Sequence, residues 1–373
     1  HILYPAHLSL EQCSSQATAQ YKAEIMFDMV RLWGDFPVIT TVADDITSDN
    51  IEDVYSQYFP EQNTELEAYQ QIEKDLLDAV LYAPDNTPGN KTLFTKSVAR
   101  TLLAKIYAEK PLRDYTKVIQ YCDEVKADGF DLVDDFSDLF GMNAAGTDAK
   151  MRNTKESILE AQFTSGAGNW CTWMFGRDLV NWNNNFTWAK WVTPSRDLIS
   201  AFKQEGDEVR FKESIVYYDC NWSNYYPSDN YPFMYKCRSA NSSIIKYRYA
   251  DVLLLKAEAL IMQDTPDLEG AADIIDKVRD RAKLGALPTS VRSNKNAMLN
   301  ALLKERRLEL AFEGQRWFDL VRLDKVEEVM NAVYAKDSGR KAQIYTFDKN
   351  SYRLPIPQSV IDANDKIHQN PGY

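Results

Sequence analysis

The residues best suited to ligand chemistry lie in the middle of the chain, where tryptophan and tyrosine are concentrated. Between Phe163 and Tyr235, 18 of 73 residues are aromatic, about twice the chain average of 12%, and six of the eight tryptophans lie in this stretch. Flat indole and phenol rings can cover the weakly apolar C–H face of a pyranose, while amides, carboxylates and guanidinium groups bind its hydroxyls. This composition predicts a surface that binds sugars.

The candidate binding residues combine these rings with polar neighbours. The aromatic candidates are Trp170, Trp173, Trp182, Trp188, Trp222, Tyr225 and Tyr226. The polar candidates are Asn169, Arg177, Asp178, Asn183, Asn184 and Asn224. Stacking contributes about 1 kcal/mol per ring beyond area burial, so two or three rings with a few hydrogen bonds predict micromolar to millimolar affinity. The alternative is that most of these rings form the core of a loop-rich segment.

A second chemical feature is a pair of charges inside an apolar helical stripe. At 100° per residue, Arg306 and Glu313 fall on the face of a helix that carries leucines. Isolated charges are costly to bury, so we expect partners on the helix that begins near Tyr247, which offers Asp251 and Glu258. The leucines of this face are Leu299, Leu302, Leu303 and Leu310. The pattern predicts an ion network in the core.

No catalytic, cofactor or metal site is indicated. The sequence has no G-x-S-x-G elbow and no phosphate-binding glycine loop. Its three histidines, His1, His7 and His368, lie at the ends of the chain, which argues against zinc or a thiol protease. The acidic stretch from Asp131 to Asp138 lacks EF-hand spacing and alternates with apolar residues, which predicts a packed turn.

The five cysteines form no CxxC motif. Cys122 falls in a helical pattern and is expected to be a small core residue. Cys171, Cys220 and Cys237 lie in the aromatic region and could include a disulfide in an oxidising compartment, but the sequence leaves their pairing open.

The charge of the chain restricts its partners. Its 55 carboxylates outnumber 43 Lys plus Arg, and the net charge of −12 argues against binding to nucleic acid or to an anionic membrane surface. No apolar run approaches the roughly 20 residues that span a bilayer. Neutral ligands fit this composition better.

Helical patterns on both sides of the aromatic region predict the scaffold that positions it. The predicted helices cover residues from 64 to the break at Pro84, 95–109, 115–127, 247–263, 268–283 and 296–313, and a capped helix start is expected within Trp191–Phe202. We therefore expect a mainly α fold of tetratricopeptide-like helical pairs. Residues 1–160 and 240–373 would form this scaffold and residues 161–239 a loop-rich aromatic region mounted on it, in one compact unit.

Four stretches of the chain resemble one known family. The run from Glu305 to Leu320 is similar to the carboxy-terminal signature of the SusD/RagB family, nutrient-binding outer-membrane lipoproteins of Bacteroidetes-type bacteria. The other matching stretches, in order, are Phe27–Pro37, Tyr247–Ala259, and Leu354–Gln358 with Gln369–Tyr373. Family members usually carry more sequence before the first of these, so we expect the chain to be shortened at its amino end.

The resemblance implies a SusD-like fold and a function. The implied function is non-catalytic capture of oligosaccharide or polysaccharide at the cell surface, beside a SusC-like TonB-dependent outer-membrane transporter. It also implies a lipid anchor on an amino-terminal cysteine, for which Cys13 is a poor candidate, because it lies in a polar stretch. Peptide binding in the same transport role is the alternative, and a glycoside hydrolase is a third.

Overall fold

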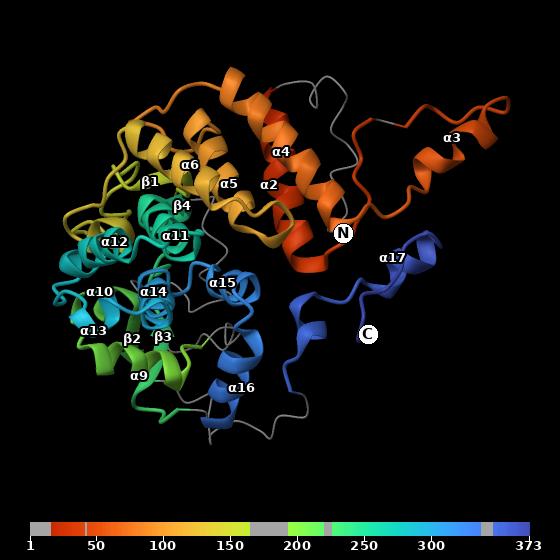
Figure 1. The fold of residues 1–373 in the computed structure, drawn as a ribbon. Helices are drawn as coiled ribbons and strands as arrows, with labels where there is room; N and C mark the ends of the chain where they lie inside the picture. The colour runs from red at the N-terminus through yellow and green to blue at the C-terminus, as the bar shows by residue number, and fades with distance from the viewer. Residues whose placement is uncertain (1–15, 42, 165–192, 220–225, 337–345) are drawn as a thin grey trace.

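The computed structural model describes residues 16–41, 43–164, 193–219, 226–336 and 346–373, and the fold is mainly α-helical, as predicted (Figure 1). The longer helices of the first half are α2 (Gln16–Trp33), α4 (Glu65–Tyr82), α5 (Lys96–Ala108) and α6 (Tyr115–Ala127). Those of the second half are α9 (Arg196–Glu205), α11 (Tyr249–Met262), α12 (Leu268–Arg281), α14 (Lys295–Glu309) and α16 (Val326–Lys336). Shorter helices are α3 (Ile51–Tyr58), α7 (Ser137–Phe140), α10 (Glu208–Ser214), α13 (Thr289–Arg292), α15 (Arg316–Arg322) and α17 (Gln358–Ala363), with 3-10 turns η1 (Lys110–Leu112) and η2 (Lys349–Tyr352).

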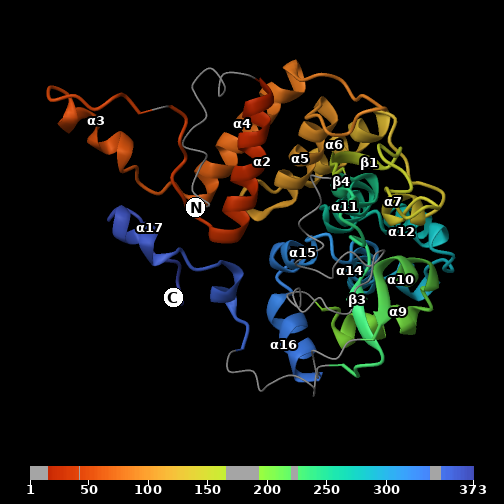
Figure 2. The ribbon, with the colours of Figure 1, turned by 180° about the vertical axis from the view of Figure 1, so that it is seen from behind.

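The long helices stack in sequence-adjacent pairs. Helix α2 packs on α4, α4 on α5, and α5 on α6, after which α6 contacts α11 and α11 packs on both α12 and α14. Their facing stripes form one large core, in which small residues such as Ala99, Ala104 and Ala108 are fully buried and let the helices approach closely. Figures 1 and 2 show this layered arrangement from opposite sides. It agrees with the predicted helical-pair scaffold.

The helix boundaries follow from capping and breaking residues. Thr64 forms a capping box with Glu67 at the start of α4, and Ser195 accepts the Leu198 N–H at the start of α9, where a capped helix was predicted. The predicted helix 296–313 is wrong at its end, because α14 stops at Glu309. Beyond it, Phe312 and Gly314 have φ values of +66° and +76°, which a continuing α-helix cannot adopt.

Two small antiparallel sheets were not predicted. Strand β1 (Ser157–Ala161) pairs with β4 (Ile244–Arg248), so the helix expected from residue 247 begins only at Tyr249. Strand β2 (Ile215–Tyr218) pairs with β3 (Tyr231–Met234), with Ile215 opposite Met234 and Tyr218 opposite Tyr231. The described part of residues 161–239 thus contains α9, α10 and a β-hairpin, although its aromatic spacing follows no regular period.

The ends of the described chain meet. The Leu354 N–H donates to Leu32 O at 2.7 Å, and the Asn370 amide donates to Trp33 O at 2.8 Å. Arg353 forms an ion pair with Glu65 at the start of α4. The first and last stretches of the family resemblance therefore lie side by side, which gives these distant sequence positions one structural role.

Candidate functional site

Most candidate binding residues lie outside the described part of the chain. Residues 165–192 contain Asn169, Trp170, Trp173, Arg177, Asp178, Trp182, Asn183, Asn184 and Trp188, and residues 220–225 contain Trp222, Asn224 and Tyr225. Cys171 and Cys220 lie outside it too, while Cys237 is buried. Of the candidates, the structure places Tyr226.

Tyr226 is partly buried, and its polar and aromatic groups are engaged. Its hydroxyl donates to Pro194 O at 2.8 Å. The Arg196 guanidinium lies 4.8 Å from the ring centroid, and the Tyr231 ring meets it edge-on, with centroids 5.7 Å apart. These contacts fix the ring at the start of α9, so any surface it offers to a ligand is held in one orientation.

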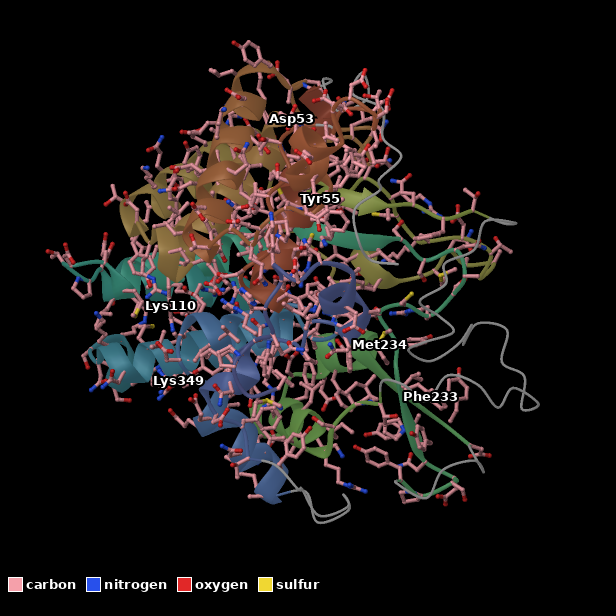
Figure 3. The ribbon with its side chains drawn as sticks, turned by 90° about the vertical axis from the view of Figure 1, so that its right-hand side faces the viewer. Asp53, Tyr55, Lys110, Phe233, Met234 and Lys349 are labelled. Carbon is pink, nitrogen blue, oxygen red and sulfur yellow. The ribbon has the colours of Figure 1, made fainter. Side chains whose placement is uncertain are left out.

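Tyr226 belongs to an aromatic cluster built on the β2–β3 hairpin, which we call the aromatic hairpin. Its buried centre is Tyr231 and Phe233, whose ring centroids are 5.1 Å apart. Around these two pack Val216, Tyr218, Tyr226 and Tyr235. Figure 3 shows Phe233 and Met234 of β3 well apart from Asp53 and Tyr55 of α3. Burial raises the pKa of Tyr217 and of Tyr218 above the ordinary value.

The aromatic hairpin is where the aromatic-rich segments join the fold. Thr193 follows residues 165–192 directly, and its hydroxyl is 2.8 Å from the Tyr231 hydroxyl. Asp219 and Tyr226 flank residues 220–225, at the end of β2 and in the cluster itself. Three of the four chain positions that border these segments therefore lie on or next to this one platform.

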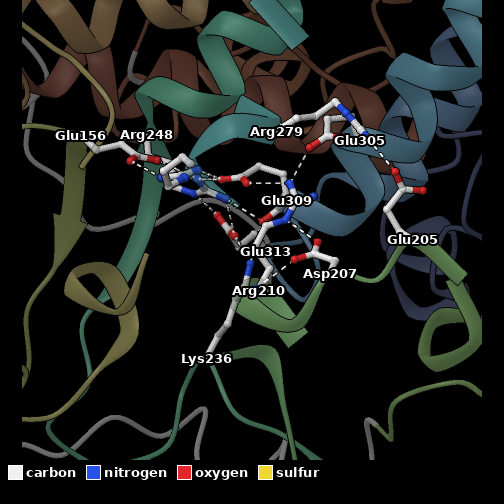
Figure 4. A network of polar contacts seen from close by, with 11 residues as sticks. Glu156, Glu205, Asp207, Arg210, Lys236, Arg248, Arg279, Glu305, Glu309 and Glu313 are labelled. Carbon is white, nitrogen blue, oxygen red and sulfur yellow. Dashed lines mark hydrogen bonds and ion pairs between the residues drawn. The ribbon is translucent and has the colours of Figure 1, made fainter. Parts of the chain in front are cut away.

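A buried ion network lies between the aromatic hairpin and the helices (Figure 4). At its centre, the Glu309 carboxylate on α14 accepts from Arg248 at 2.5 Å, from Arg210 at 3.0 Å, and from Arg281. Burial alone would raise the pKa of Glu309, but these three guanidinium groups hold it well below the usual value. Glu156 binds Arg248 and Arg281 from the other side, so each central charge has a partner.

Lys236, two residues after β3, connects the hairpin to this network. Its buried ammonium donates to Glu309 O at 2.8 Å and to Glu313 Oε1 at 2.6 Å. Arg248 donates to both oxygens of Glu313 as well, at 2.6 and 2.8 Å. Burial lowers the pKa of Lys236 to about 8, which the Glu313 charge only partly opposes. The hairpin is thereby fixed to the turn after α14.

The predicted core ion network is confirmed for Arg306 and Asp251, whereas Glu258 and Glu313 have other partners than predicted. Arg306 is buried and donates to Asp251 Oδ1 at 2.7 Å, as expected, and also to Asp319. Glu258 instead binds Arg322. Glu313 pairs with Lys236 and Arg248, because the turn after Glu309 carries it off the α14 stripe.

Several network residues were not identified from the sequence. Arg210, Lys236 and Arg248 lie in or beside short elements, α10, β3 and β4, which carry no long hydrophobic period. The sequence did contain a signal for two of them, because Arg248 lies in the stretch that resembles the family and Lys236 directly follows Tyr235, the last residue of the aromatic-rich stretch. Charges beside such elements could have been paired with the carboxylates of residues 305–313.

The acidic stretch and Cys122 take part in packing, and the described residues contain neither a metal-binding group nor a membrane-spanning helix. Phe136, Leu139 and Phe140 form a small core with Val133 and Ile245, so the acidic stretch from Asp131 is a packed turn as expected. Cys122 is buried in the main core. Within the described ranges, no group of three or more His, Cys, Asp or Glu could hold a metal ion. No helix there combines the length and apolarity needed to cross a membrane.

Comparison with known proteins finds similarity to SusD-like proteins. The model of the SusD family matches residues 229–373. The SusD-like protein P2 of Formosa agariphila is 28% identical, over 94% of this chain and 72% of its own length. A laminarin-binding SusD-like protein has a TM-score of 0.69 at 22% identity, over 96% of this chain and 78% of its own.

A further solved structure has the same fold. The surface glycan-binding protein A of Bacteroides thetaiotaomicron, in complex with laminarihexaose, has a TM-score of 0.70 at 18% identity, over 95% of this chain and 79% of its own. The matched sequence range contains Lys236, Arg248, Arg306 and Glu313, the charges that fix the hairpin and the helices together. Residues 229–373 thus match the SusD family model, and the chain is similar to a SusD-like protein over 94% of its length.

Proposed function

We propose that this protein binds oligosaccharide or polysaccharide at the cell surface and delivers it to a TonB-dependent outer-membrane transporter, without cleaving it. The observation that carries this proposal is the aromatic hairpin. It joins segments of the chain that hold six of the eight tryptophans to a scaffold fixed by buried ion pairs. Two proteins of the same fold bind laminarin or laminarihexaose, which supports a glycan as the ligand class.

The chemistry suits capture and transfer. Rings that stack on pyranose faces tolerate many sugars, while amides, carboxylates and guanidinium groups at the ring edges set specificity. Because binding costs offset much of the stacking energy, the expected affinity is micromolar to millimolar, weak enough to release cargo. The net charge of −12 favours neutral glycans over anionic polymers.

Tryptophan fluorescence tests the ligand. The folded protein is titrated with laminarin, other soluble neutral polysaccharides and, in parallel, a pool of peptides. We expect a saturable change with at least one glycan, reduced in Trp182→Ala and Trp222→Ala but unchanged in Trp33→Phe, whose ring lies in α2. A response to peptides alone would assign the protein to peptide capture. No fluorescence change with any glycan, or release of reducing sugar from one, would contradict the proposal.

The transport role has a separate test. We propose that the full-length protein is lipid-anchored and exposed on the outer membrane. Protease added to intact cells should then degrade it, while a periplasmic marker survives. A TonB-dependent transporter should purify with it from detergent-solubilised outer membranes, and failure to recover one would refute this part while leaving glycan binding intact.

A further inference from the structure

The segment that projects from the helical body presents an exposed apolar stripe. Helix α3 and its flanks, residues 43–63, extend away from the stacked helices in Figures 1 and 2, and we call this segment the acidic arm. On α3, Ile51, Tyr55 and Tyr58 follow helical spacing of four and three residues and are 54%, 53% and 44% exposed. Ile46, in the flank before α3, is 56% exposed. Soluble proteins rarely display grouped large apolar side chains without a partner.

Hydrogen bonds within the acidic arm fix its conformation. The Asp44 N–H donates to Gln57 Oε1 at 2.8 Å, Gln57 donates back to the Asp44 carboxylate, and the Tyr58 hydroxyl donates to Asp44 O. Asn50 accepts from the Thr47 N–H and donates to Asp45 O, which ties the flank to the start of α3. Because these bonds fix the stripe before any partner arrives, binding would lose little conformational entropy.

The base of the arm is anchored to the body. Asn63 donates its N–H to Phe36 O at 3.1 Å and accepts the Val38 N–H at 2.8 Å. At the far side of the base, Asn364 after α17 donates to Pro60 O at 2.8 Å. The apolar stripe is therefore held at a fixed position beyond the surface of the helical body.

The charges of the arm restrict its partner. Its six carboxylates are Asp44, Asp45, Asp49, Glu52, Asp53 and Glu61. No Lys or Arg occurs between Arg31 and Lys74, so no cation of the arm itself neutralises them. Two copies of the chain would repel each other at this surface, as would an anionic membrane. A helix with apolar residues at four- and three-residue spacing fits an apolar groove, and its carboxylates fit a basic rim.

We propose that the acidic arm is a docking element, which inserts the stripe of Ile51, Tyr55 and Tyr58 into an apolar groove bordered by lysine and arginine on a partner protein. In the proposed function, on which this inference rests, that partner is the outer-membrane transporter. Tyrosine is among the side chains that carry most binding energy at protein interfaces, so Tyr55 is the expected anchor. The aromatic hairpin lies apart from the arm in Figure 3 and stays available to glycan.

Site-specific photocrosslinking tests the contact. A benzoylphenylalanine replaces Tyr55 in one protein and Tyr82 in a control, because Tyr82 is 61% exposed but lies at the other end of α4. We expect position 55 to crosslink to the transporter in intact cells and position 82 not to. A crosslink from position 55 only to a second copy of this chain, to lipid, or to no protein would overturn the proposal.

Binding measurements on the purified transporter then test the chemistry. We expect Tyr55→Ser to weaken the complex by about 30-fold or more, Asp45→Lys to weaken it most at low salt, and Tyr82→Ser to leave it unchanged. Glycan affinity should be unchanged in all three variants. Equal transporter affinity in Tyr55→Ser and wild type would overturn the docking role alone. If the wild-type protein did not bind any glycan, the proposed function itself would be overturned.

Discussion

Arg306 on α14 donates to Asp251 on α11 at 2.7 Å, and both side chains are buried. The same guanidinium donates to both oxygens of Asp319 on α15, at 2.8 and 2.9 Å. Lys105 on α5 donates to the second oxygen of Asp251. One buried set of charges thus fixes helices from both halves of the chain in a single arrangement.

Removing Arg306 should destabilise the protein strongly. Arg306→Ala leaves Asp251 and Asp319 buried beside fewer cations, so we expect a loss of ~3 kcal/mol or more in the free energy of unfolding, measured by urea denaturation. Lys155→Ala, which breaks a pair with the exposed Asp134, is the matched control and should change stability by less than ~0.5 kcal/mol. A loss of that small size in Arg306→Ala would mean that the side chain is solvated.

Acid should unfold the protein through the same carboxylates. Burial raises the pKa of Asp251, but Lys105 and Arg306 hold it below its ordinary value of 3.8, and the pKa of Glu309 is likewise below 4.5. Because these pKa values are lowered in the folded state, their contribution is complete above about pH 4.5 and is lost as pH falls. Urea midpoints between pH 6 and pH 3 should therefore decline steeply, and less so in Glu309→Gln. An equal decline of the urea midpoint with falling pH in wild type and Glu309→Gln would contradict a lowered pKa of Glu309 in the folded protein.

The long elements of the fold were predictable, and the reason is physical. Helices α4, α5 and α6 carry apolar stripes of three or more turns, with Thr64 and the Pro84 region marking boundaries. Strands β1 to β4 have four or five residues each, too short for a period-two pattern to stand out. Strands β1 and β4 pair across a long stretch of chain, from Ser157 to Arg248, and local spacing does not encode such contacts.

The sequence indicated which part of the chain is rich in candidate binding residues, but it did not indicate how these residues are arranged in space. The density of rings between Phe163 and Tyr235 indicated a binding region, and for every candidate residue ligand binding stays a prediction. For Tyr226, the contacts with Arg196 and Tyr231 could not be foreseen, because they depend on how the hairpin meets α9. The Glu309 cluster shows the same limit, since its three arginines come from α10, β4 and α12.

The turn after α14 should be sensitive to glycine replacement. Gly314 has φ of +76°, and a Cβ added there would meet no neighbouring atom within 4 Å, so Gly314→Ala would strain the backbone without a clash. We expect a loss of about 1–2 kcal/mol in unfolding free energy. Gly285→Ala is the control, because that site is equally open and lacks a positive φ. Equal effects of the two changes would show that the turn tolerates L-residues.

The hydroxyl of Tyr231 should matter for glycan binding as well as stability. Tyr231→Phe removes the 2.8 Å contact with Thr193, the residue that follows the longer aromatic segment. We expect a stability loss of about 1 kcal/mol and, under the proposed function, a several-fold weaker glycan affinity, because Thr193 directly follows the segment that carries most candidate rings. Calorimetric unfolding and fluorescence titration measure the two effects. An unchanged glycan affinity despite reduced stability would mean that the aromatic hairpin does not contribute to glycan binding.

Alkaline conditions should stabilise the protein through Lys236. Because burial lowers its pKa from 10.5 to about 8, the unfolded chain binds more protons than the folded protein between these values, and stability rises with pH across that window. From about pH 7.5 to about pH 9.5 the expected gain is on the order of 2 kcal/mol in unfolding free energy. Lys236→Met keeps the volume and lacks the titrating group, so its stability should not show this gain. A parallel pH dependence in both proteins would mean that the ammonium ionises normally, in contact with solvent.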